Sequence, residues 1–490
     1  MRRFNYSLLG LIGGPLLFGF FYFIYQPDTI NRTAWLVAGI LLLMTIWWIT
    51  EAIPIYATGL VPLIFFPLLN LFDLKVVAVS YAHPLVLLFL GGFIIASAME
   101  ASGLHKRIAI KILAISGTSP SKIIAGFMVT TALLSMWVSN TASTIMMLPI
   151  ATSVVAIFSS QNKVEDKNFS IPLLLAIAYS ASIGGAATLI GTPTNIMLAS
   201  ILSDTYKFQI SFIDWFLIGF PVTIILVPLV WLFLVKIVFK VSSVKSNALE
   251  KTLLKLKKEI GTAGNSEKVV ALIFFFTAIL WILRKFLNES IGLNLNDTSI
   301  GLLGALLLFV IPTGKNKRAC NWNTANKIPW GVLFLVGGGI ALSKAIKSSG
   351  LADWIGSFSD YLYGLDVYLL MFISVALIIF LTELNSNTAT VATFTPILII
   401  FAIGLEINPL FFVIPTTIAA SCAFMLPIAT PPNAVIFGSG KIKIKDMIKA
   451  GVGLNLLSIF IVSIISILVL NFIFNQDIMV LPDWVLINKS

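Results

Sequence analysis

The chain has 490 residues, of which 58% are hydrophobic and only 11% are charged. A soluble globular protein carries roughly 25% charged residues, so the composition excludes a soluble domain and predicts an all-α polytopic membrane protein. The net charge of +11 is explained better by basic loops on the cytoplasmic side of a membrane than by nucleic-acid binding, and we expect no nucleic-acid partner.

Apolar runs long enough to cross a bilayer occur along the whole chain. We expect about ten to twelve membrane-embedded helical segments, because neighbouring runs merge and their boundaries blur. The clearest runs are Leu8–Tyr25, Trp35–Trp48, Phe216–Val235, Val269–Leu283 and Leu454–Phe472.

The basic residues of the short loops predict the orientation in the cell membrane. Four basic clusters are expected in the cytoplasm, together with the N-terminus, whereas the tail 476–490 is not basic and is expected outside the cell. Segment 236–268, with eight Lys against three Glu, is expected to be a cytoplasmic linker that lies partly as an amphipathic helix on the membrane surface. The other three clusters are Arg2 with Arg3, the loop with Lys315, Lys317, Arg318 and Lys327, and the group Lys441, Lys443, Lys445 and Lys449.

The chain contains an internal duplication. At an offset of 247 positions, Gly91-Gly92 matches Gly338-Gly339 and Ser139-Asn140-Thr141-Ala142 matches Ser386-Asn387-Thr388-Ala389. Further on the offset becomes 238, and "IGTPTN" at 190–195 matches "IATPPN" at 428–433. Paired interruptions in corresponding halves point to a transporter's binding site near the membrane midplane. We expect the glycine pairs to permit close helix packing.

The two Ser-Asn-Thr triplets predict helical hairpins. Ser, Asn and Thr are favoured N-cap residues, and each triplet precedes a new apolar run, 142–158 or 389–403. The preceding arms, about 123–138 and 367–381, are short for full spans and suggest re-entrant hairpins. Two helix N-termini would then face each other across a cavity and bind an anion at each end.

The Thr-Pro breaks predict a different chemistry. Pro193 and Pro431 lack an amide donor and are expected to free carbonyl groups in the turn before each of them. Carbonyl oxygens beside Ser, Thr and Asn oxygens make a hard, neutral cage that suits Na⁺. Gly184 and Gly185 would let the backbone approach closely there.

Neither triplet nor either break contains Lys or Arg. A dianion in the membrane would therefore lack a cationic partner in these motifs, and bound Na⁺ would supply the charge, unless Lys111, Lys344 or Lys347 folds in from elsewhere. Glu51 and Glu383 also lie near membrane depth, where acids are usually functional. For these two we favour structural hydrogen bonds to nearby backbone.

"WWITEAIP", the two triplets and the "GTPTN" and "ATPPN" breaks resemble the divalent anion/sodium symporter family of dicarboxylate and citrate transporters. The resemblance implies a homodimer in lipid, eleven transmembrane helices plus two re-entrant hairpins, an inverted repeat and an elevator motion. It divides the chain into scaffold helices at about 1–110 and 269–356, transport elements at 111–235 and 357–475, the linker 236–268 and the tail 476–490.

The resemblance also assigns residues. It implies that the substrate carboxylates contact Ser139, Asn140, Thr141, Ser386, Asn387, Thr388, Thr430 and Pro431. A first Na⁺ site would use Ser135, Ser139, Asn140 and Gly191, and a second would use Thr382, Asn385, Asn387 and Ala429. Asn385 and Thr194 depart from the family pattern, where a small residue and a second proline are usual, and this leaves cation coupling more open than substrate class.

The leading hypothesis is a secondary active transporter that couples uptake of C4 dicarboxylates such as succinate, malate or fumarate to Na⁺, with no other cofactor. The alternative is Na⁺-independent exchange of organic anions at the same site. A membrane enzyme would need a nucleophile with a base or a metal cluster. The two isolated His residues offer neither, so we expect no enzyme. A channel would not accumulate its substrate against a gradient.

Overall fold

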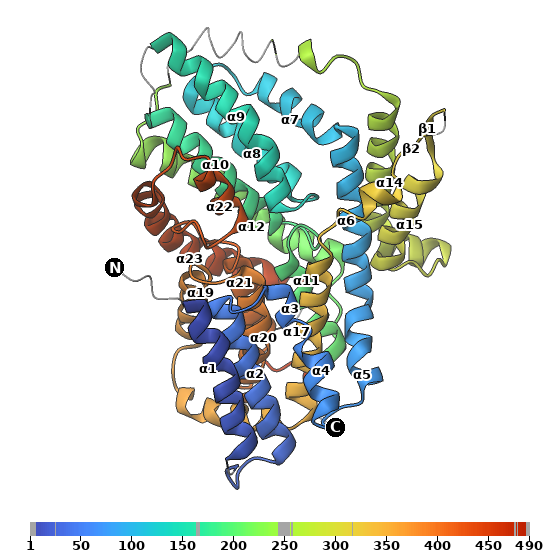
Figure 1. Cartoon of the computed structure of the whole chain (residues 1–490), viewed down its shortest axis with the longest axis vertical. Helices are drawn as coiled ribbons and strands as arrows, with labels where there is room; N and C mark the ends of the chain where they lie inside the picture. Colours follow the sequence, from blue (N-terminus) through green and yellow to red (C-terminus); the bar gives the residue numbers. More distant parts are fainter. Residues whose placement is uncertain are drawn as a thin grey trace.

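The computed structural model describes residues 6–24, 26–162, 167–243, 255, 258–315, 317–474, 477 and 479–486. Arg2, Arg3, Lys489 and most of the expected surface helix, at 244–254 and 256–257, lie outside the described residues. The described chain is mainly helical (Figure 1), and its one sheet is the two-stranded hairpin of β1 (Pro312–Gly314) and β2 (Lys317–Arg318).

The helices of the N-terminal half begin with an antiparallel pair and end at the linker. They are α1 (Tyr6–Phe23), α2 (Arg32–Thr50), α3 (Ile55–Thr58), α4 (Val61–Leu68), α5 (Leu74–Val79), η1 (Ser80–Ala82), α6 (Pro84–Ser102), α7 (Leu104–Ile115), α8 (Pro120–Ser135), α9 (Asn140–Asn162), α10 (Lys167–Gly185), α11 (Pro193–Tyr206), α12 (Phe212–Leu232) and η2 (Phe233–Val238).

The helices of the C-terminal half follow the linker. They are α14 (Asn265–Ile291), α15 (Asp297–Val310), α16 (Trp322–Ala325), α17 (Trp330–Ser348), α18 (Leu351–Gly356), η3 (Ser357–Leu362), α19 (Val367–Thr382), α20 (Asn387–Gly404), α21 (Leu410–Ala419), α22 (Pro431–Gly438), α23 (Ile444–Phe474) and α24 (Asp483–Leu486).

Among the described residues, nine helices are long and apolar enough to cross a membrane. The count becomes ten if Leu351–Leu362 and Val367–Thr382, which are bent by 119° at a short break, form one span. Several shorter apolar helices, including α8, α15 and α21, accompany them. The polytopic all-α class expected from composition is therefore confirmed, while the division into eleven spans and two re-entrant hairpins stays a prediction.

The duplication read from the sequence reappears in the helix boundaries. Helix α19 begins and ends 247 positions after α8, and α20 begins 247 positions after α9. Helix α22 begins 238 positions after α11. In Figure 1 the α8–α9 pair lies in the upper half of the molecule, and α19 and α20 lie below it.

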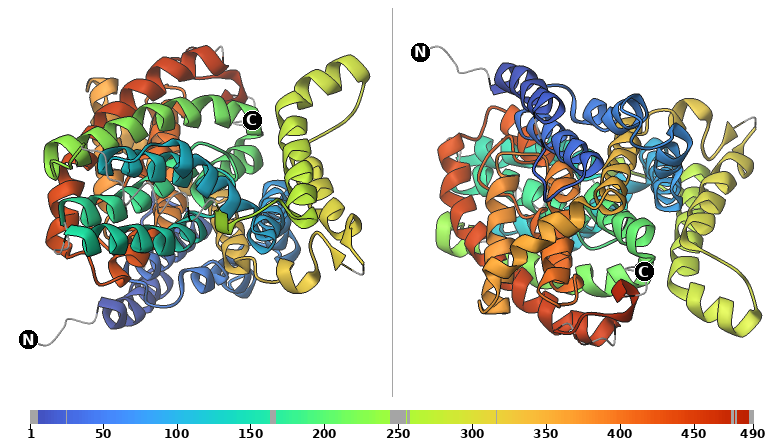
Figure 2. Two further views of the ribbon diagram at one scale, coloured as in Figure 1. Left: turned by 90° about the horizontal axis from the view of Figure 1, so that it is seen from above. Right: turned by 90° about the horizontal axis from the view of Figure 1, so that it is seen from below.

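Elements of the two halves interlock around α10. This helix packs against α8 and α9 of its own half and against α22 of the other, and nearly all of it is buried. The Tyr179 hydroxyl donates to the Phe424 carbonyl oxygen at 2.7 Å, which fastens α10 to the loop before α22. Figure 2 shows α14 and α15 at the edge of the molecule, beside α6.

The glycine motifs bring helices into backbone contact, as the sequence predicted. A Cβ at Gly91 would lie 2.7 Å from the carbonyl carbon of Gly301. A Cβ at Gly338 would overlap the backbone of Gly59. By contrast, Gly92 would make only ordinary contacts, with the side chain of Ile190. These approaches hold α6 against α15 and α17 against the turn between α3 and α4.

The substitution Gly338→Ala is expected to destabilise the protein by about 1–3 kcal/mol, because the added methyl group meets fixed backbone. The matched control is Gly13→Ala, where a Cβ would have nothing within 4 Å and the better helix propensity of Ala is neutral or slightly favourable. Thermal unfolding in detergent measures both variants. Equal melting temperatures would contradict the packing role of Gly338.

Candidate functional site

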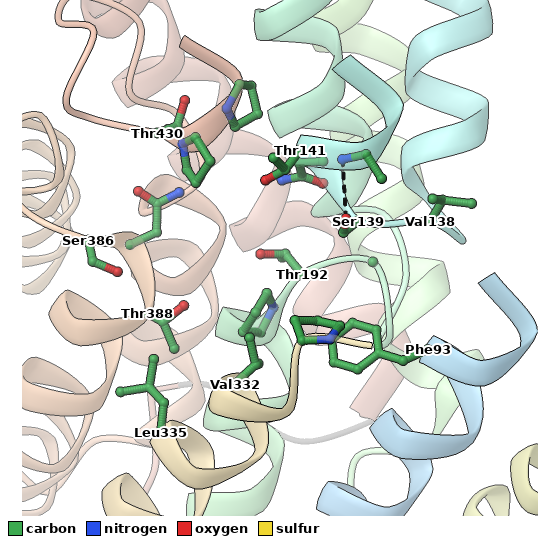
Figure 3. Close-up of a pocket in the computed structure, with 18 of the residues that line it drawn as sticks. Phe93, Val138, Ser139, Thr141, Thr192, Val332, Leu335, Ser386, Thr388 and Thr430 are labelled. Carbon is green, nitrogen blue, oxygen red and sulfur yellow. Dashed lines mark hydrogen bonds between the residues drawn. The ribbon is translucent and has the colours of Figure 1, made fainter. Parts of the chain in front are cut away.

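Both triplets and both breaks line one cavity of about 740 Å³. Figure 3 shows Ser139 and Thr141 on one side and Ser386 and Thr388 on the other, with Thr192 and Thr430 between them. The residues expected from the sequence that line the cavity are Ser139, Asn140, Thr141, Gly191, Ser386, Asn387, Thr388, Ala429, Thr430 and Pro431. Ser135, Thr382 and Asn385 are buried behind this wall and are absent from it.

Four helices begin at the cavity wall. Helices α9 and α20 start at Asn140 and Asn387, as the triplets predicted, and α11 and α22 start at Pro193 and Pro431. The first amides of a helix have no partner inside it, and the helix dipole adds about half a positive charge there. The cavity therefore presents several electropositive backbone ends to an anion.

The helix starts of the two hairpins have matching side-chain contacts. The Ser135 hydroxyl donates to Asn140 Oδ1 at 2.6 Å, and the Thr382 hydroxyl donates to Asn387 Oδ1 at 2.6 Å. Each hairpin thus places a hydroxyl and an amide oxygen together just behind the cavity wall. Ser139 Oγ accepts from the Ala142 amide at 3.3 Å, whereas Ser386 makes no side-chain cap.

Further contacts surround these two pairs. A Cβ at Gly185 would overlap the Asn140 side chain, so this glycine allows the α10 terminus to reach the first hairpin. In the second half, Thr382 Oγ1 also lies 3.1 Å from the Ala420 carbonyl oxygen. Asn385 Oδ1 accepts from the Ser386 amide at 3.0 Å, which uses one of its oxygen lone pairs inside the turn.

The prolines do not interrupt a continuous helix, and this part of the sequence prediction is wrong. Pro193 and Pro431 occupy the first helical position after N-caps Thr192 and Thr430, where an amide would be unpaired anyway. The non-helical backbone lies instead in the loops 186–192 and 420–430 that precede the prolines.

The two acids behave differently. Glu383 is buried, with an exposed fraction of 3%. Its carboxylate accepts the backbone amides of Phe424, Met425 and Leu426 at 2.6, 2.8 and 3.0 Å, and Asn455 Nδ2 at 2.7 Å. The structural role expected for Glu383 is confirmed.

Glu51 does not share this role. It is exposed, has a left-handed backbone (φ 45°) at the end of α2, and lines the cavity. Its carboxylate makes no hydrogen bond within the described part of the chain, so the expectation of a backbone contact is wrong for Glu51.

Sequence reasoning missed one wall of the cavity. Side chains of α6, α3 and α17 form a mainly apolar surface, with Phe93 and the pair Val332 and Leu335 labelled in Figure 3, and Ser97 and Glu100 of α6 also line it. Nothing in the local pattern marks these residues, because apolar side chains on a membrane helix are ordinary. The glycine motifs on α6 and α17 were the only sequence signal near them.

The basic residue at the cavity was also missed. Lys344 pairs with Asp204 at 3.6 Å, and Lys347 donates to the Thr205 carbonyl oxygen at 2.8 Å. Neither lines the cavity, and neither does Lys111. Among the described lining residues the basic side chain is Lys327, which is exposed and comes from the segment before α17.

A bundle of apolar helices around a cavity where four helix termini meet an apolar wall is the architecture of a polytopic membrane transport protein. Residues 9–474 match the family model described as the sodium:sulfate symporter transmembrane region. The chain belongs to this divalent anion/sodium symporter family, whose members are transporters and not enzymes.

Relatives of known name agree with the family. The sodium-dependent dicarboxylate transporter SdcS of Staphylococcus saprophyticus is 40% identical over 469 residues, which cover 94% of this chain and 90% of the relative. The protein of the same name from Staphylococcus aureus strain bovine RF122 / ET3-1 is 41% identical over 483 residues and covers 96% of this chain and 93% of its own length.

Two solved membrane-protein structures share the fold at low sequence identity. MtrF of Neisseria gonorrhoeae, described within a class of antimetabolite efflux pumps, has a TM-score of 0.60 at 13% identity, covering 93% of this chain and 96% of its own. The YdaH transporter of Alcanivorax borkumensis has a TM-score of 0.54 at 13% identity, covering 92% and 100%.

The substitution Glu383→Ala is expected to destabilise the loop before α22, because three backbone amides lose a charged acceptor and each such hydrogen bond contributes about 1.5–3 kcal/mol. Glu383→Gln should lie between wild type and Glu383→Ala. Glu51→Gln, at the exposed acid, serves as the control. Thermal unfolding in detergent tests the order, and a Glu383→Ala variant as stable as Glu51→Gln would contradict it.

Proposed function

We propose that the chain is a secondary active transporter that moves C4 dicarboxylates across the cytoplasmic membrane by Na⁺-coupled symport. The observation that carries the proposal is the pair of helix starts at Asn140 and Asn387 on opposite sides of one cavity. A carboxylate at each end of a short substrate would accept hydrogen bonds from one helix start and its hydroxyl and amide side chains.

The substrate residues follow from this arrangement. Ser139, Asn140 and Thr141 would hold one carboxylate, and Ser386, Asn387 and Thr388 the other, with Thr430 and Pro431 between them. The relatives named as dicarboxylate transporters support this substrate class. We restrict it to four-carbon chains because succinate, malate and fumarate each present two carboxylates at opposite ends.

The charge of the site supports cation coupling. Each helix start supplies about half a charge, and the triplets and breaks carry no basic side chain. Two bound Na⁺ ions would offset the charge of a dianion in a medium of low dielectric constant. We propose a first Na⁺ at Ser135, Ser139, Asn140 and Gly191, and a second at Thr382, Asn385, Asn387 and Ala429.

We further propose that transport is an elevator movement in a homodimer. Segments 111–235 and 357–475 would carry the substrate as the moving unit, and the helices of 1–110 and 269–356 would stand still. The mainly apolar surface of α6 and α17 at the cavity supports this division, since apolar side chains such as Phe93, Val332 and Leu335 form no hydrogen bonds that would hold the moving polar site. We propose that the N-terminus lies in the cytoplasm and the C-terminus outside the cell.

One observation favours the alternative of Na⁺-independent anion exchange. Lys327 lines the cavity and supplies a positive charge that could take the place of a bound cation. Thr194 and Asn385 depart from the family pattern near the two proposed Na⁺ sites. These departures also favour Na⁺-independent exchange.

Purified protein in liposomes separates the two modes. For symport, uptake of labelled succinate into vesicles without internal dicarboxylate should rise steeply with external Na⁺ and vanish when choline replaces Na⁺. For exchange, uptake should require internal dicarboxylate and ignore the Na⁺ gradient, and that result would overturn symport. Accumulation above the external concentration excludes a channel.

The variants Asn140→Ala and Asn387→Ala are each expected to lower succinate affinity by at least about tenfold, because each removes an amide from a carboxylate subsite and a charged hydrogen bond contributes about 1.5–3 kcal/mol. Asn323→Ala, at an exposed position outside the cavity, is the control. Succinate binding and size-exclusion profiles are measured together. Unchanged affinity in both cavity variants would remove these residues from the site.

A further inference from the structure

Two corresponding asparagines, Asn195 and Asn433, bind the loops 186–192 and 420–430 through hydrogen bonds. Both asparagines are fully buried. The side-chain Nδ2 of each donates to two corresponding carbonyl oxygens that precede it in the chain, and Asn195 Nδ2 also donates to a third, that of Ala186, at 3.4 Å. The corresponding acceptors are Gly185 at 3.2 Å and Thr188 at 2.7 Å for Asn195, and Ala423 at 3.1 Å and Leu426 at 3.0 Å for Asn433. Each contact in the second half lies 238 positions after its counterpart in the first.

These contacts fix the orientation of both amides. An Asn side chain has a donor nitrogen and an acceptor oxygen, and exchanging them would set an oxygen against two carbonyl oxygens. The Oδ1 atom of Asn433 therefore points away from Ala423 and Leu426.

The two Oδ1 atoms differ in what they contact. The Thr194 hydroxyl lies 3.3 Å from Asn195 Oδ1 and can donate to it. At the corresponding position of the second half stands Pro432, which has no hydroxyl. Asn433 Oδ1 is buried and has no hydrogen-bond partner within the described part of the chain. A buried acceptor without a hydrogen-bond partner costs desolvation free energy. The structure therefore favours a donor or a cation at Asn433 Oδ1.

Asn433 is connected to the proposed second Na⁺ site. The Leu426 carbonyl oxygen that accepts from Asn433 Nδ2 also accepts from the Ala429 amide at 3.3 Å. The Leu426 amide in turn donates to Glu383, the residue next to Thr382. Leu426 thus connects the Asn433 amide through its carbonyl oxygen to Ala429, and its own amide contacts Glu383, which follows Thr382 at the end of α19.

We propose that Asn433 Oδ1 is a ligand of the Na⁺ bound in the second half, and that the first half lacks this ligand because Thr194 occupies Asn195 Oδ1. Neutral amide and carbonyl oxygens suit a hard cation such as Na⁺. The two cation sites would then be unequal, with one more oxygen ligand in the second. This inference rests on the proposed Na⁺ coupling.

Two isosteric substitutions at one position test it. Pro432→Thr supplies the hydroxyl that Thr194 supplies in the first half, and Pro432→Val has the same shape without a hydroxyl, so both share any effect of losing the proline ring. The first readout is the Na⁺ concentration that gives half-maximal thermal stabilisation of purified protein, with choline chloride keeping the ionic strength constant. The second is the Na⁺ dependence of succinate uptake in liposomes.

Pro432→Thr is expected to need about three- to tenfold more Na⁺ than Pro432→Val, the change expected when one neutral oxygen ligand is lost. Asn433→Ala should need more Na⁺ than Asn195→Ala. Both variants lose the two corresponding loop contacts, and Asn195→Ala also loses the contacts with Ala186 and with the Thr194 hydroxyl. Only Asn433→Ala loses the proposed ligand.

The outcomes separate this inference from the proposed function. If wild-type uptake depends on Na⁺ but both comparisons show equal Na⁺ requirements, Asn433 Oδ1 holds water and the inference is overturned while symport stands. If wild-type protein shows no response to Na⁺ in either readout, symport itself fails and the inference fails with it.

Discussion

The structure depends on one constraint, the need to place four helix N-termini inside an apolar bundle. An unpaired amide in hydrocarbon costs several kcal/mol. Helices α11 and α22 limit this cost by beginning with prolines, which have no amide. Ser139 and Thr430 each accept one amide, at α9 and α22. The buried helix α10 packs against elements of both halves beside these helix starts. The positive ends of the helix dipoles make the cavity wall electropositive.

The duplicated halves preserve backbone geometry more closely than side-chain chemistry. The hydrogen bond from Ser135 to Asn140 has the same length as the one from Thr382 to Asn387. Asn195 and Asn433 bind corresponding carbonyl oxygens of their loops. The loop contacts at the hairpin ends differ, because Met136 offers its carbonyl oxygen to Thr188 where Glu383 offers a carboxylate to three amides. The two halves therefore combine a similar backbone with a different distribution of charge.

Much of this organisation was predictable from local pattern. Composition determined the membrane class, because hydrocarbon admits few charges. The repeat offsets located both hairpins and both loops, because a duplication keeps its spacing. Ser-Asn-Thr identified the helix starts at Asn140 and Asn387, because these side chains favour the N-cap region. Gly91 and Gly338 marked close backbone contacts, since only glycine fits there.

Tertiary structure alone decided the rest. The apolar wall of Phe93, Val332 and Leu335 and the basic Lys327 reach the cavity from helices whose sequences look like any other span. The prolines were misread because their effect depends on whether a helix continues through them. The lack of a hydrogen-bond partner at Asn433 Oδ1 could be recognised only in the structure, because the carbonyl groups of Ala423 and Leu426 determine the orientation of this amide. Sequence patterns report which residues share a face or a turn, whereas the contacts that complete a site join segments far apart in the chain, and only the packed fold sets their distances.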